Sequence, residues 1–170
     1  MLKYIAIFTS LAAVCLAGDS SLYRDADPEF IRSGRRVEQR HKKLAAQPTP
    51  REWHSGAIWR FVTTAPSGKP PLPVITVRVT DEPAHSCSSD SDWKSDWRKL
   101  VVVEGKTPLP PIYQVEGRAL QINLTGEICD VYDNIKGALT NAEFNGQRTA
   151  TGLGAPSEVL GTVRGSCVQQ

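Results

Sequence analysis

Apolar and polar residues follow a two-residue period through most of residues 51–170, and Gly, Pro, Asn and Asp separate the apolar runs. In 57–64, for example, Trp59 and Phe61 fall on the same face of an extended chain. This spacing is typical of β-strands. Further strands are predicted at 72–80, 100–104, 112–116 and 119–125, with about three more between Gly137 and Cys167, one of them at 157–165. About eight short strands predict an all-β domain, either a small antiparallel β-barrel or a β-sandwich.

Two features of this region leave alternatives open. Ile128, Val131, Tyr132 and Ile135 have the spacing of one helix face, so a short helix after Cys129 competes with a strand there. The segments 59–73 and 97–110 also resemble each other, each reading as a strand, a Gly-Lys connection held extended by prolines, and a returning strand. A duplicated hairpin and similarity of composition account for this equally well.

Residues 1–17 have the pattern of a secretory signal peptide. Lys3 precedes an apolar run that ends at small residues, and this run is shorter than the roughly 20 residues that span a membrane. Cleavage near Ala17 is favoured over lipidation of Cys15, because the residues before that cysteine depart from the bacterial lipoprotein pattern. The sequence therefore predicts a periplasmic or secreted protein without a transmembrane segment.

Residues 18–50 form a basic segment that differs from the β domain at 51–170. Asp27 and Pro28 are a favourable N-cap and first helical residue, and helix-compatible residues continue to about Ala46. Within residues 30–43 the basic residues far outnumber the acidic ones, since only Glu38 is set against Arg32, Arg35, Arg36, Arg40, Lys42 and Lys43. With so few apolar positions, the segment is predicted to be a solvated, partly helical tether. A helix that docks on an acidic partner or on the membrane surface is the alternative.

Composition limits the classes of function. The chain has 170 residues and carries 20 basic and 18 acidic side chains, a net charge of +2. Such a small charge does not favour nucleic acid as a partner. Removal of the signal peptide would leave three cysteines, Cys87, Cys129 and Cys167. In an oxidising compartment two of these are expected to form a disulfide and one to remain free or to link two chains, but their spacing does not select the pair.

Motifs that would indicate catalysis or a bound cofactor are not found in the sequence. His41, His54 and His85 lack metal-site spacing, so no metal is predicted. Residues 90–96 place acids as a calcium loop does, but the later Gly and Glu of that loop are missing. The chain also lacks G-x-S-x-G, G-x-G-x-x-G and P-loop patterns. We therefore predict neither an enzyme nor a cofactor.

The sequence points instead to a binding surface in the segment SDSDWKSDWRK. Trp93 and Trp97 are candidate anchors for a partner, and Asp92 and Asp96 could face a basic cleft on it. The alternative places Trp97 in the core beneath Trp93. The predicted function is an exported module that inhibits or sequesters another exported protein, such as a toxin or a cell-wall enzyme. A β-barrel that binds a carbohydrate or another small ligand is the alternative.

Overall fold

The computed structural model describes residues 28–86, 96–126, 128, 131–154 and 156–169. The chain divides into two units, Met1–Gln39 and Arg40–Gln170. Helix α1 (Pro28–Ala45) supplies the described residues of the first unit and continues into the second. The predicted helix, beginning at Pro28 and ending near Ala46, is confirmed.

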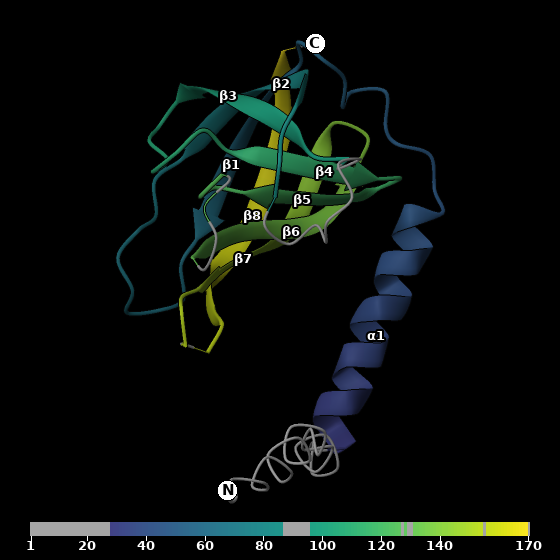
Figure 1. The fold of residues 1–170 in the computed structure, drawn as a ribbon, viewed down its shortest axis with the longest axis vertical. Helices are drawn as coiled ribbons and strands as arrows, with labels where there is room; N and C mark the ends of the chain where they lie inside the picture. Colours follow the sequence, from purple (N-terminus) through teal and green to yellow (C-terminus); the bar gives the residue numbers. More distant parts are fainter. Residues whose placement is uncertain (1–27, 87–95, 127, 129–130, 155, 170) are drawn as a thin grey trace, which may run out of the picture. The chain divides into compact units, whose positions relative to one another are not determined.

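In the part of the chain that the structure describes, eight strands follow α1 and form a closed antiparallel barrel, in which each strand pairs with its neighbours in sequence and β8 closes on β1 (Figure 1). The all-β prediction is confirmed, and the architecture is a barrel rather than a sandwich. Among the described residues, closure gives every strand a partner on both sides, although β3 and β4 pair only through Arg98–Tyr113 and Lys99–Ile112. The strands are β1 (Ile58–Thr64), β2 (Ile75–Pro83), β3 (Arg98–Glu104), β4 (Ile112–Glu116), β5 (Ala119–Asn123), β6 (Tyr132–Thr140), β7 (Glu143–Thr151) and β8 (Glu158–Gln169).

The structure differs from the sequence-based expectation in the start of β2 and in the segment after Cys129. β2 begins at Ile75 rather than at residue 72, after prolines that cannot donate to a strand ladder. The alternative of a short helix after Cys129 is wrong, because β6 begins at Tyr132. Ile135 faces the barrel interior, whereas Ile128 and Val131 are 42% and 48% exposed, so the apparent helical stripe is not one buried face.

Aromatic and branched side chains fill the interior of the barrel. Trp53 precedes β1 and packs against Trp59 and Tyr113, with ring centroids 5.2 and 5.3 Å away. Deeper along the barrel, the rings of Phe61 and Phe144 meet edge to face at 5.5 Å. The other buried apolar residues of this cluster are Ala57, Ile75, Val77, Val79, Leu100, Leu120, Ile122, Leu124, Ile135, Leu139 and Val163.

Inward-facing glycines make room for the two phenylalanine rings. Gly165 of β8 lies opposite both Phe61 and Phe144, and a Cβ at this position would come within 2.7 Å of the Phe61 ring. A Cβ at Gly146 would come within 2.6 Å of the Phe144 ring. At Gly146 and Gly165 the two rings therefore pack directly against the backbones of β7 and β8, in the space that inward side chains would otherwise occupy.

The end of α1 contacts the hairpin between β4 and β5, within the second unit. The Arg118 amide donates to the Leu44 carbonyl at 3.0 Å, which satisfies one of the last carbonyls of the helix. Gly117 turns with φ +55°, and a Cβ there would lie 2.2 Å from the Gln47 carbonyl oxygen. His41 Nε2 also lies 3.1 Å from the Glu116 carboxylate. The close approach of the two backbones thus requires glycine at this turn.

Candidate functional site

The structure describes two of the four residues predicted to contact a partner. Trp97 is 4% exposed and packs with Ala84 and Ile112 in a small cluster apart from the main core. Its burial leaves little indole surface for a partner and matches the alternative in which it belongs to the core. Asp96 is exposed, while Asp92 and Trp93 lie outside the described residues. The contact role of this segment stays a prediction.

Cys167 is a free thiol, so it forms no disulfide in this structure. It lies opposite Trp59 in the pairing of β1 with β8, and its Sγ is 3.5 Å from the Gln169 carbonyl oxygen. Partial burial raises the pKa of this thiol. Cys87 and Cys129, the other two disulfide candidates, lie outside the described residues.

The barrel interior is occupied at the end where Trp53 lies. The Tyr113 hydroxyl donates to the Thr80 carbonyl at 2.9 Å, and the Trp59 indole donates to the Glu52 carbonyl at 3.2 Å. Burial, with the nearby charge of Asp81, raises the pKa of Tyr113 to about 12. A ligand entering at this end would have to displace these packed side chains and break their hydrogen bonds.

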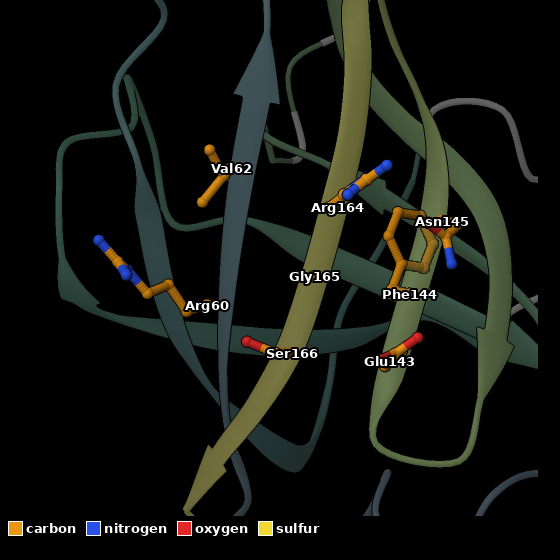
Figure 2. A pocket seen from close by; sticks show the side chains of 8 residues that line it. All are labelled: Arg60, Val62, Glu143, Phe144, Asn145, Arg164, Gly165 and Ser166. Carbon is orange, nitrogen blue, oxygen red and sulfur yellow. The ribbon is translucent and has the colours of Figure 1, made fainter.

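The outer wall of the barrel instead carries an open hollow of about 490 Å³ over β1, β8 and β7 (Figure 2). It lies over Gly165 and Phe144, which both line it. Its outward side chains are polar except for one valine: Arg60 and Val62 from β1, Arg164 and Ser166 from β8, and Glu143 and Asn145 from β7. Cavities that bind small ligands are mostly apolar and more enclosed, and this open, polar hollow differs from them.

Two arginines of the hollow belong to a diagonal row that crosses three strands. Arg164 pairs with Val62, two residues along β1 from Arg60. Arg78 pairs with Ile58, two residues from Arg60 in the other direction. The side chains of Arg60, Arg78 and Arg164, which we call the arginine row, are all exposed on the outer face. The Cα atoms of diagonal neighbours in an antiparallel sheet lie roughly 7–8 Å apart, so the three arginines project from the wall at regular backbone intervals.

Within the described chain, the arginine row has no ion-pair partner, whereas Lys69, Lys99 and Arg148 each contact a carboxylate. The residues directly opposite Arg60 on its two neighbouring strands are uncharged: Ser166 on β8 and Thr76 on β2. Glu143 and Glu104 lie one strand further out on either side, and Glu104 accepts a hydrogen bond from the Thr76 hydroxyl at 3.0 Å. The guanidinium groups therefore remain available to an external anion. Glu143 and Glu104 lie on the strands on either side of them.

Exposed apolar side chains accompany the arginine row. Val62 is 40% exposed and lies between Arg60 and Arg164, while Val101 is 47% exposed and pairs with Arg78. Arginine beside apolar surface is a common composition of protein interfaces, because the guanidinium stacks and forms bidentate hydrogen bonds with little hydration to lose.

The described residues offer neither a metal site nor a membrane-spanning helix. No three His, Cys, Asp or Glu side chains within them are grouped so that they could hold a metal ion. In the same part of the chain, no helix combines the length and apolarity that crossing a membrane requires. The segment 90–96, considered above for calcium, lies outside the described residues except for Asp96.

No protein-family model matches the chain, and no match was found among the curated proteins or among the solved structures. The candidate surface therefore depends on its own geometry. Sequence reasoning missed it because Arg60, Arg78 and Arg164 are far apart in the chain and each resembles an ordinary outward residue of a strand. The sequence shows that each arginine alternates with apolar residues, but it does not show the strand register that places the three arginines next to one another.

Proposed function

We propose that the protein is an exported binding module that inhibits or sequesters another exported protein, and that the outer face of β8, β1 and β2 is its contact surface. The observation that carries the proposal is the arginine row beside the open hollow, which forms no ion pair with any described residue. Arginine is enriched among the residues that dominate binding energy at interfaces. An exposed arginine without an internal partner loses no internal ion pair when it binds one outside.

The closed barrel supports this assignment because it holds the surface rigid. Each arginine projects from a strand that is hydrogen-bonded on both sides, and the inner faces of the same strands pack into the aromatic core. A preformed surface has little backbone entropy to lose when it binds. The packed aromatic residues at the Trp53 end of the barrel and the rigid outer wall together favour recognition on the wall over entry at that end.

The test is affinity capture from cell-envelope extract with the purified protein as bait, followed by mass spectrometry. The variant R60Q/R78Q/R164Q removes the arginine row, and R35Q/R36Q/R40Q removes the same charge from exposed positions of α1. We expect a specific protein to be retained by the wild type and by the α1 variant and to be lost with the row variant. Equal capture by all three would refute this surface assignment.

The same experiment separates the alternative function. A carbohydrate-binding barrel would retain glycan rather than protein, and its binding would not depend on three outward arginines. Retention of glycan by the wild type and by the row variant alike would therefore replace the proposed function with this alternative.

A further inference from the structure

We propose that the arginine row binds an extended acidic segment of the partner protein whose carboxylates occupy alternate positions, in the pattern acid-x-acid-x-acid. This inference rests on the proposed function and specifies its chemistry. It follows from three properties of the row: its spacing, its lack of ion-pair partners among the described residues and the charges that border it.

Spacing favours an extended chain with alternating acids. Side chains on one face of an extended segment recur every second residue, roughly 6.6–6.8 Å apart. The diagonal steps from Arg164 to Arg60 and from Arg60 to Arg78 are each roughly 7–8 Å. Three alternate carboxylates could therefore meet three guanidinium groups in register, whereas consecutive acids would point half of their charge away from the wall.

The chemistry of the side chains favours carboxylates on a peptide. Each guanidinium presents a planar fork that accommodates a carboxylate through two parallel hydrogen bonds. Val62 and Val101 provide apolar contact beside the forks, which suits a peptide backbone and its aliphatic carbons more than a fully hydrated polyanion. Glu143 and Glu104 border the row on both sides, so a wide anionic surface would meet repulsion where a single narrow chain does not.

The experiment compares two labelled pentapeptides of identical composition by fluorescence anisotropy. One has the order Glu-Ser-Glu-Ser-Glu, which alternates its acids, and the other has the order Glu-Glu-Glu-Ser-Ser. Each is titrated with the full-length protein at low and at physiological ionic strength. The row variant R60Q/R78Q/R164Q is compared with the α1 variant R35Q/R36Q/R40Q, which has the same change in net charge.

We expect the alternating peptide to bind the wild type and the α1 variant about tenfold more tightly than it binds the row variant, since each exposed ion pair contributes a small free energy. The affinity should fall with added salt, as screened contacts require. The consecutive-acid peptide should bind several-fold more weakly than the alternating one.

Equal binding of both peptides would overturn the inference, and so would equal loss with either variant, because binding would then follow net charge alone. Tighter binding to vesicles of anionic lipid than to the alternating peptide would also overturn it. If neither peptide binds while the row variant still loses its captured protein, the proposed function stands and only the acidic-segment inference fails.

Discussion

Replacement of Asp133 by Asn should destabilise the barrel from within. Asp133 lies on β6 and accepts two hydrogen bonds from Arg148 of β7, from Nε at 2.8 Å and from Nη2 at 2.6 Å. The side chains of Arg148 and Asp133 are only 9% and 20% exposed. Arg148 Nη1 is buried as well and has no hydrogen-bond partner among the described residues. The substitution Asp133→Asn would leave the guanidinium buried without its counter-charge.

The magnitude follows from the burial of the pair. Breaking a buried ion pair by removing one partner costs about 3–5 kcal/mol. We expect about 3 kcal/mol for Asp133→Asn, the lower end of that range, because a fifth of the Asp133 side chain is exposed and water can screen the remaining charge. For a domain whose total stability is typically about 5–15 kcal/mol, this is a large fraction.

Urea unfolding followed by tryptophan fluorescence measures this loss, because Trp53 and Trp59 are buried in the native barrel. Glu158→Gln is the matched control: it makes the same carboxylate-to-amide change in the exposed pair with Lys69, and it should cost less than about 1 kcal/mol. The double variant D133L/R148M should recover most of the stability, since it leaves no buried charge. Equal effects of Asp133→Asn and Glu158→Gln would refute the reasoning.

Three further predictions test the core. Gly165→Ala should cost about 1–3 kcal/mol, because its Cβ would press on the Phe61 ring, whereas Ser166→Ala on the outer face should change the urea midpoint little. Trp53→Ala should cost about 3–5 kcal/mol and shift Trp59 emission to longer wavelength as water reaches the barrel end; an unchanged spectrum would contradict the packing. Tyr113, with its pKa raised to about 12, should produce a late phenolate step in an absorbance titration that Tyr113→Phe removes. The folded state keeps this proton above pH 10, where unfolded tyrosine releases it. The contribution of Tyr113 to stability should therefore be full below pH 10 and be lost between about pH 10 and 12, which is measured as the difference between the wild type and Tyr113→Phe. A difference that grows in this window would contradict the burial of Tyr113.

Much of the fold could be predicted because its local signals agree. The alternation of Trp59 and Phe61 with outward residues marks β1, and the expected strand at 112–116 coincides with β4. Pro28 marks the start of α1 within a segment too polar for a core. These features depend on neighbours in sequence, which the sequence displays directly. Barrel and sandwich could not be distinguished, because the pairing of β1 with β8 leaves no local mark.

The burial of Trp97 agrees with the core position that the sequence left open, but the sequence did not identify the neighbours that bury it. An aromatic residue beside aspartates and lysines resembles an exposed anchor, but its surroundings are Ala84, just after β2, and Ile112, the first residue of β4. Neither contact could be read from the sequence near Trp97. Trp97 is therefore buried in a small apolar cluster that is separate from the barrel core. The local sequence was equally compatible with this position and with contact to a partner.

Barrel closure also explains why the arginine row is a stronger candidate for function than any single arginine in it. Closure brings Arg164, from the last strand, beside Arg60, from the first, and the β1–β2 register continues the line to Arg78. Like charges on neighbouring strands repel each other, and in the described chain no carboxylate pairs with them. The barrel thus carries a small electrostatic cost at these positions without a packing gain, since all three side chains point away from the core. Packing does not require charge at these outward positions, whereas binding an acidic segment, as proposed above, would turn the same repulsion into attraction.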